Sequence, residues 1–205
     1  MSFLSWLSWL PSGFAQNPLG RTRRQRPPAK RRPGRRLRLE SLEGRTLMSG
    51  LSLTAASVSD LIADINAANT AGGANTITLA APTTSPYVLT AVNNSTNGPT
   101  GLPMIAANDN LTIVGNGDTI ERSTAVGALD FRLLAVASGG SLTLENLTLQ
   151  GGYDATGDGG AICNCGTLVL SGVTVQDNDA LGGGGGIYSY LGSVTLEGGT
   201  IVQSN

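Results

Sequence analysis

Carboxylate side chains recur at matching places in the second half of the chain. Asp154 and Asp158 lie in one loop, and Asp177 and Asp179 lie in the equivalent loop one repeat later. If the two loops stack, four carboxylates converge, and Ca²⁺ is held by oxygen ligands of this kind. Aspartate is also a common turn residue, because its side chain hydrogen-bonds the local backbone. We favour the turn interpretation and expect no metal and no cofactor, with Ca²⁺ as the alternative.

The absence of histidine excludes much of the common enzyme chemistry. A serine or cysteine nucleophile in a triad needs an imidazole base. Residues 46–205 also contain no lysine, so the glycine runs at 159–160 and 184–186 lack the cation of a phosphate-binding loop. These glycines suit tight turns instead, because glycine adopts positive φ at little cost. We expect no catalytic residue in the sequence.

Two cysteines, Cys163 and Cys165, are alternate residues on or just after an expected strand. Alternate strand residues point to the same side, with β-carbons farther apart than the roughly 4 Å of a disulfide. Two ligands alone do not make a zinc site. We interpret both cysteines as buried or stacked thiols, with a local disulfide as the alternative.

Length and composition indicate one domain of turn-rich β structure with a tail. The chain has 205 residues, of which 29 are glycine, and 13% are charged while 40% are hydrophobic. Charged residues are about half as frequent as in average soluble domains, and glycine is about twice as frequent. A disordered chain would lack this apolar content, and collagen would need glycine at every third position.

A repeat of 26 residues runs through the second half of the chain. It relates three sets of side chains, which are Leu142, Leu168 and Val194, then Leu144, Leu170 and Leu196, then Thr148, Thr174 and Thr200. Further matches upstream place the starts of successive coils near residues 76, 105, 136, 162 and 187, with Val136 aligned to Ile162. A period in the twenties with Gly, Asn and Asp turns predicts a solenoid, whose units bury apolar faces by stacking.

Each unit contains three short strands, which in the third coil cover 161–162, 168–170 and 173–175. Strand alternation places Leu168 and Leu170 on the inner face and Val169 on the outer face. The sequence therefore predicts an all-β fold, a parallel β-helix with about 26 residues per coil. The hand should be right, as in nearly all parallel crossovers. Leucine-rich repeats are similar in period but need a helical or asparagine-anchored half.

A short helix is expected before the first coil. Ser57 can cap it together with Asp60, and apolar side chains at helical spacing extend over 58–69. We interpret this helix as a cap over the apolar end of a β-helix domain that covers residues 50–205. An ordinary surface helix is the alternative.

The first 49 residues differ in composition from the rest and are expected to form a disordered basic leader. They hold eleven of the 13 lysines and arginines, whereas the remaining residues hold only Arg122 and Arg132 against twelve carboxylates. The sequence assigns no role to these two arginines. Repelling cations interrupted by proline cannot bury a face. The apolar patch at 3–10 is shorter than the roughly 20 residues of a membrane span, so we expect no transmembrane helix.

The string from Arg36 to Ser49, RLRLESLEGRTLMS, resembles the basic leader RLxLExLExRxLLS of large planctomycete-type surface and secreted proteins. Gly44 and Met48 depart from that form. The resemblance implies export, so we expect a secreted or cell-surface location in a bacterial envelope. Nucleic-acid binding by counterion release is the alternative. The tail lacks the interleaved aromatic side chains of single-strand binders, so we expect no nucleic-acid partner. The apolar run 47–56 is either a weak export signal or the first strand.

The repeats carry a second resemblance. Gly159-Gly160-Ala161-Ile162 followed by Val175-Gln176-Asp177-Asn178 is similar to the GGAI and FxxN repeats of polymorphic outer-membrane proteins and related pectate-lyase-like surface β-helices. The segment 185–187 with 202–205 is similar, and valine replaces phenylalanine in both copies. Residues 61–79 resemble the opening of bacterial surface β-helix domains. The resemblance spans about residues 58–205 and implies a right-handed parallel β-helix with an adhesin-like role.

Two function classes follow from these observations. The first is an exported or cell-surface protein with a non-catalytic role in adhesion, scaffolding or binding of a polysaccharide or other cell-surface ligand. The alternative is a carbohydrate-active enzyme of the polysaccharide lyase or glycoside hydrolase type, with Ca²⁺ as its cofactor, since pectate lyases and polygalacturonases share the implied fold. The asparagine-threonine-aspartate and histidine motifs of polygalacturonases are absent.

The last coil, Ile187 to Val202, is followed by no helix, proline or charge run that would cover its strand edges. An open edge recruits further strands. We therefore expect either that this chain is part of a longer β-helix or that it self-associates through its last coil.

Overall fold

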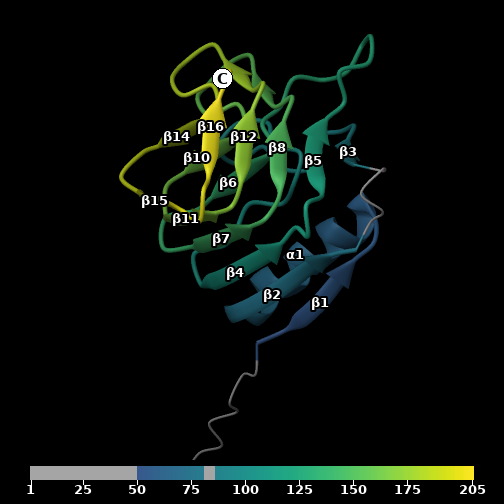
Figure 1. The fold of residues 1–205 in the computed structure, drawn as a ribbon, viewed down its shortest axis with the longest axis vertical. Helices are drawn as coiled ribbons and strands as arrows, with labels where there is room; N and C mark the ends of the chain where they lie inside the picture. The colour runs from purple at the N-terminus through teal and green to yellow at the C-terminus, as the bar shows by residue number, and fades with distance from the viewer. Residues whose placement is uncertain (1–49, 81–85) are drawn as a thin grey trace, which may run out of the picture. The chain divides into compact units, whose positions relative to one another are not determined.

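The computed structural model describes residues 50–80 and 86–205, which form a parallel β-solenoid of about 5 turns (Figure 1). A turn takes about 27 residues, and one short helix precedes the stacked coils. The predicted all-β parallel solenoid is therefore confirmed. The expected leader at 1–49 lies outside the described residues.

Three parallel sheets make up the walls of the solenoid. The first, in the order β1-β2-β4-β7-β11-β15, consists of β1 (Ser52–Ala55), β2 (Gly73–Leu79), β4 (Asp109–Val114), β7 (Ser141–Glu145), β11 (Thr167–Ser171) and β15 (Ser193–Glu197). The second contains β6 (Leu134–Val136), β10 (Ile162–Asn164) and β14 (Ile187–Ser189). The third contains β3 (Tyr87–Leu89), β5 (Thr119–Arg122), β8 (Thr148–Gln150), β12 (Thr174–Gln176) and β16 (Ile201–Gln203).

The strand register confirms the repeat. Leu168 pairs with Leu142 and Val194, and Leu170 pairs with the leucines one coil before and after it. Leu168 and Leu170 are fully buried, while Val169 between them is half-buried on the outer face. The inner and outer faces are therefore those that strand alternation predicts.

The alignment of Val136 with Ile162 is wrong by two residues. Ile162 pairs with Leu134, and Val136 pairs with Asn164. The turn explains the shift, because residues 137–140 separate β6 from β7 while only 165–166 separate β10 from β11. A turn that is two residues longer moves the preceding strand by two residues relative to the sequence repeat.

The predicted helix is present as α1 (Val58–Ala71), two residues longer than expected at its end. The backbone N–H of Asp60 donates to Ser57 Oγ at 3.2 Å, so Ser57 caps the helix as predicted. Three apolar side chains are fully buried in the core of the first coils, namely Leu61, Ile65 and Ala68. Before α1, residues 52–55 form β1, which fits the first-strand interpretation of this segment. No helix in the described ranges is long and apolar enough to cross a bilayer.

Glycine makes the close approach of adjacent coils sterically feasible. Gly159 and Gly184 have φ of +74° and +64°, which confirms that both turn a corner of the solenoid. At Gly160, an added β-carbon would lie 2.2 Å from the carbonyl oxygen of Asp179 and 2.4 Å from that of Gly185. A larger side chain at position 160 would therefore push two coils apart.

The outward face of the first sheet is rich in hydroxyl groups. Its paired positions place serine and threonine side chains in rows across six strands, at Ser52, Thr54, Thr76, Thr78, Thr112, Ser141, Thr143, Thr167, Ser171, Ser193 and Thr195.

We expect Leu170→Ala to lower the free energy of unfolding by about 2–5 kcal/mol, because it leaves a cavity in a close-packed column. Val169→Ala removes a half-buried outward side chain and should cost well under half of that. Urea denaturation followed by circular dichroism measures both variants. Equal losses for the two variants would mean that the strand register is wrong.

Candidate functional site

Two adjoining hollows of about 250 and 310 Å³ open at the carboxyl ends of β5 and β8. They share four lining residues, Arg122, Thr124, Gly151 and Asp177. We call the combined site the Arg122 cleft, and its remaining lining residues are Glu121, Gln150, Gly152, Tyr153 and Asp179.

Backbone carbonyl groups fix the guanidinium of Arg122. Its Nε donates to the carbonyl of Gly151 at 2.8 Å, and its Nη1 donates to those of Ser123 and Leu129 at 3.2 and 3.1 Å. The guanidinium carbon lies 5.9 Å from the centre of the Tyr153 ring, at the outer limit of a cation–π contact. Arg122 therefore stands as a rigid hydrogen-bond donor in the cleft wall.

Gly151 allows the cleft floor to form. Its φ is +70°, and an added β-carbon would lie 3.2 Å from the carbonyl oxygen of Arg122. The Gly151 N–H donates to the carbonyl of Asp177 one coil later, at 3.0 Å. The floor therefore consists of backbone from consecutive coils.

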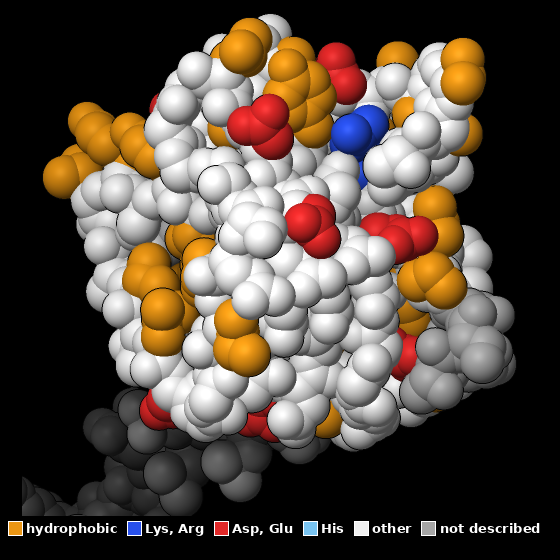
Figure 2. Space-filling model, turned by 45° about the horizontal axis from the view of Figure 1, so that its top comes forward, with side chains coloured by type: hydrophobic (Ala, Val, Ile, Leu, Met, Phe, Trp, Pro, Cys, Tyr) orange, Lys and Arg blue, Asp and Glu red, His pale blue; other side chains and the backbone are white. Residues whose placement is uncertain are grey.

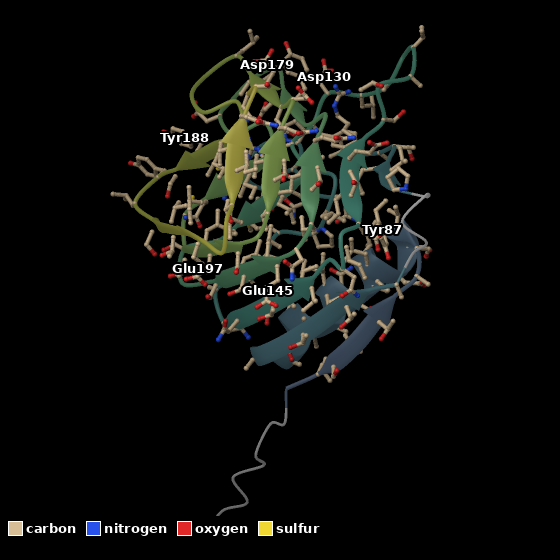
Figure 3. All side chains as sticks on the ribbon, in the orientation of Figure 1. Tyr87, Asp130, Glu145, Asp179, Tyr188 and Glu197 are labelled. Carbon is tan, nitrogen blue, oxygen red and sulfur yellow. The ribbon has the colours of Figure 1, made fainter. Side chains whose placement is uncertain are left out.

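Carboxylates outnumber cations around the cleft. Glu121, Asp177 and Asp179 line it, and Asp130 approaches Arg122 Nη1 at 3.9 Å. Asp130 and Asp179 both lie at the upper end of the molecule in Figure 3, and Figure 2 shows a small basic patch with acidic side chains around it on this side. The described groups of the cleft therefore carry more negative than positive charge, with a single guanidinium among them.

A row of side-chain amides leads out of the cleft across the third sheet. Gln150 Nε2 donates to Glu121 Oε2 at 2.6 Å, Gln176 Nε2 donates to Gln150 Oε1 at 3.3 Å, and Gln203 Nε2 donates to Gln176 Oε1 at 3.1 Å. These four residues, called the glutamine ladder, occupy paired positions on β5, β8, β12 and β16. The sequence held a signal for the ladder, since Gln150, Gln176 and Gln203 follow the repeat.

The four carboxylates of the alternative calcium site do not gather. A short fourth sheet, of β9 (Tyr153–Asp154) and β13 (Asp179–Ala180), pairs Asp154 with Ala180 and Asp179 with Tyr153. Asp154 turns inward and is fully buried, while Asp158 accepts a hydrogen bond from the N–H of Gly183. Within residues 50–80 and 86–205, no three His, Cys, Asp or Glu side chains are placed to hold a metal ion.

Asp154 instead forms a buried ion pair with Arg132, whose side chain is 2% exposed. The other oxygen of Asp154 accepts hydrogen bonds from the N–H and hydroxyl of Thr156 at 3.0 and 3.1 Å. Arg132 Nη1 donates to the carbonyl of Asn97. The pair thus joins the segment before β6 to the end of β9.

The pKa of Asp154 is lowered, although burial alone would raise it. The hydrogen bonds from Thr156 and from Arg132, together with the positive charge of Arg132, outweigh the burial. Burial raises the pKa of Asp109, which accepts a hydrogen bond from Asn75 at 2.7 Å and has an unpartnered second oxygen. Asp154 and Asp109 both lie outside the Arg122 cleft.

Cys163 and Cys165 are free thiols, as the interpretation of buried or stacked thiols expects, although Cys165 is only half-buried. Cys163 is buried, and this burial raises its pKa, while the charge of Arg132 opposes the shift. Cys165 lines a groove of about 440 Å³ along the turns that precede β7, β11 and β15. The groove is lined by serine, glycine, threonine, leucine and this cysteine, so it offers no charged or aromatic group to a ligand.

Sequence reasoning assigned no role to Arg122, Arg132 or Tyr153. None of the three side-chain types recurs at the matching position of a neighbouring coil, so the repeat did not single them out. Arg122 ends β5, Arg132 lies in the loop before β6, and Tyr153 pairs with Asp179. The apolar neighbours of Arg132, Phe131 and Leu133, were a signal of its burial.

Comparison with protein-family models, with curated proteins and with solved structures finds no match to this chain.

We expect Asp154→Asn to lower the free energy of unfolding at pH 7 by about 3–5 kcal/mol, because it leaves the Arg132 charge buried without a counterion. The matched control is Asp130→Asn, which removes an exposed ion pair and should cost less than about 1 kcal/mol. Because the pKa of Asp154 is lowered in the folded state, its stabilisation is present above the unfolded pKa of about 3.9 and is lost as the pH falls below it. Denaturation at pH 7 and at acidic pH measures the difference. A deficit that grows on acidification would contradict this assignment.

Proposed function

We propose that the chain is an exported or cell-surface protein whose solenoid has a non-catalytic role in binding, adhesion or scaffolding. The observation that supports a binding role is the Arg122 cleft with its glutamine ladder, because this site offers hydrogen-bonding groups that are fixed on rigid strands. Arg122 is held by three backbone carbonyls, and the ladder residues are held by one another. Such pre-organised groups favour binding, because little side-chain freedom is lost when a ligand arrives.

The first sheet supports a scaffolding role for the same protein. Its outward face is mostly hydroxyl-bearing, with Val114 and Val169 between the hydroxyl groups and Glu145 and Glu197 as its charged side chains in the described coils. A sheet of this kind can contact another surface over a large area with few charges to desolvate.

Electrostatics disfavours an acidic polysaccharide as substrate, which weakens the enzyme alternative. Arg122 and Arg132 are the only cations of residues 50–205, and Arg132 is buried against Asp154. Arg122 is therefore the one cation that lines the cleft, together with the carboxylates of Glu121, Asp177 and Asp179. A polyuronate chain would therefore meet excess negative charge.

We also propose that copies of the chain associate through the last described coil. Val194, Leu196 and Val202 are 37, 52 and 44% exposed, whereas their partners one coil earlier, Leu168, Leu170 and Val175, are fully buried. In the segment 187–205 only Glu197 carries a charge, so two copies that meet at this coil face little repulsion. The edge strands β14, β15 and β16 add free backbone groups to the contact.

The proposed function predicts binding without turnover. We expect the purified protein to release no unsaturated product from polygalacturonate or alginate, and no reducing sugar from neutral polysaccharides, with or without calcium. Ultraviolet absorbance and reducing-end assays measure both reactions, and a pectate lyase is the positive control. Calcium-dependent product formation would favour the enzyme alternative.

The association predicts a sedimentation coefficient that rises with protein concentration. Leu196→Lys should shift the equilibrium toward the monomer, since it places a charge in the apolar contact. Leu181→Lys is the control, because the Leu181 side chain is 72% exposed and lies outside the last coil. This variant should leave association unchanged. A wild-type protein that stays monomeric at every concentration would refute self-association.

A further inference from the structure

We infer that the Arg122 cleft and the glutamine ladder bind one chain of an uncharged polysaccharide, which runs across β5, β8, β12 and β16. This inference rests on the non-catalytic binding role proposed above and names the ligand of that site. Four features of the site support it, namely the free hydrogen-bonding groups, the aromatic wall, the charge of the cleft and the spacing of the ladder.

The cleft contains polar atoms that the folded chain leaves available. Arg122 uses Nε and Nη1 for backbone carbonyls, so Nη2 is free to donate to a ligand. Within the described residues, the hydroxyl of Tyr153 and the carboxylate of Asp177 make no hydrogen bond. A donor, an acceptor and a hydroxyl in one hollow match the vicinal hydroxyl groups of a sugar, which both donate and accept.

Tyr153 supplies an apolar surface beside these polar atoms. Its half-buried ring lines the cleft next to Arg122 and Thr124. One face of a pyranose ring carries mainly C–H bonds, and these pack favourably on the electron-rich face of an aromatic ring. The combination of an aromatic wall with planar polar groups therefore suits a sugar ring better than a purely polar or purely apolar ligand.

The charge of the cleft selects among polysaccharides. One guanidinium stands against the carboxylates of Glu121, Asp177 and Asp179, with Asp130 close to it. A uronate or sulfated chain would be repelled. An uncharged sugar avoids this repulsion and can still donate its hydroxyl protons to the carboxylates.

The ladder extends the site from one sugar to a chain. Each glutamine inside the ladder uses one N–H and one oxygen lone pair for its neighbours, so a second N–H and a second lone pair remain for a ligand. Adjacent strands lie about 4.8 Å apart, so the same amide recurs at that interval across the sheet. A polymer with a regular repeat can engage several of these equivalent groups at once.

Isothermal titration of the full chain tests the inference with hexasaccharides of β-linked glucose, mannose and xylose, and with hexagalacturonate as the acidic probe. We expect at least one neutral hexasaccharide to bind and hexagalacturonate to bind at least about tenfold more weakly. Tyr153→Ala should lower the affinity for the neutral hexasaccharide by about tenfold or more, as expected for an aromatic anchor. Tyr190→Ala is the matched control, because Tyr190 is 58% exposed and lies outside the cleft. The Tyr190→Ala variant should bind the neutral hexasaccharide with unchanged affinity.

Gln176→Leu is a second variant that keeps the size of the side chain on an exposed sheet surface, in case Tyr153→Ala does not fold. This variant should also lower the affinity for the neutral hexasaccharide, because it interrupts the ladder. The inference is overturned if no neutral hexasaccharide binds, if hexagalacturonate binds as tightly, or if both variants bind like the wild type. Cleavage of a bound hexasaccharide would instead refute the non-catalytic role and leave the site assignment in place.

Discussion

Stacking of each coil on the next is the interaction on which this structure depends. A single coil has three short strands and a few inward apolar side chains, and it cannot bury them alone. Leu168 and Leu170 are fully buried because Leu142 and Leu144 lie on one side of them and Val194 and Leu196 on the other. At the N-terminal side α1 contributes Leu61 and Ile65 to the same core.

The same stacking produces the polar features of the surface. When coils superimpose, identical side chains form rows, and the glutamine ladder and the hydroxyl rows of the first sheet both arise in this way. Asparagine also repeats, since Asn178 Nδ2 donates to Asn205 Oδ1 at 2.8 Å and Asn178 Oδ1 accepts from the N–H of Gly152. The repeat of the coils therefore produces a candidate binding surface. The Arg122 cleft forms where this repeat is interrupted.

The sequence was sufficient for the fold because the inward leucines of β7 and β11 have apolar counterparts 26 residues later. It located α1 through the capping pair of Ser57 and Asp60, and it located the corner glycines Gly159 and Gly184. It failed where side chains or turn lengths depart from the repeat. Arg122 ends β5 without an arginine at the matching place of another coil, and Arg132 lies in the loop before β6. The sheet of β9 and β13 consists of two-residue strands, and Val136 was misaligned by a longer turn. The carboxylate pairs looked equivalent in spacing, but only the folded chain reveals that Asp154 points inward to Arg132.

Deletion of one whole coil tests the central claim of in-register stacking most directly. Ser171 and Glu197 are paired in the first sheet, so removal of residues 172–197 joins equivalent positions of two coils. We predict that this variant keeps a cooperative thermal transition and a β-type circular dichroism spectrum, because Gly198 to Gln203 can take the place of β12 beside β8. Removal of residues 172–184, half of that length, places the rest of the chain out of register with β8 and β11, so we expect a lower melting temperature than for the whole-coil deletion. Loss of folded structure in the whole-coil deletion, or a half-coil deletion that melts at the same or a higher temperature, would contradict the account.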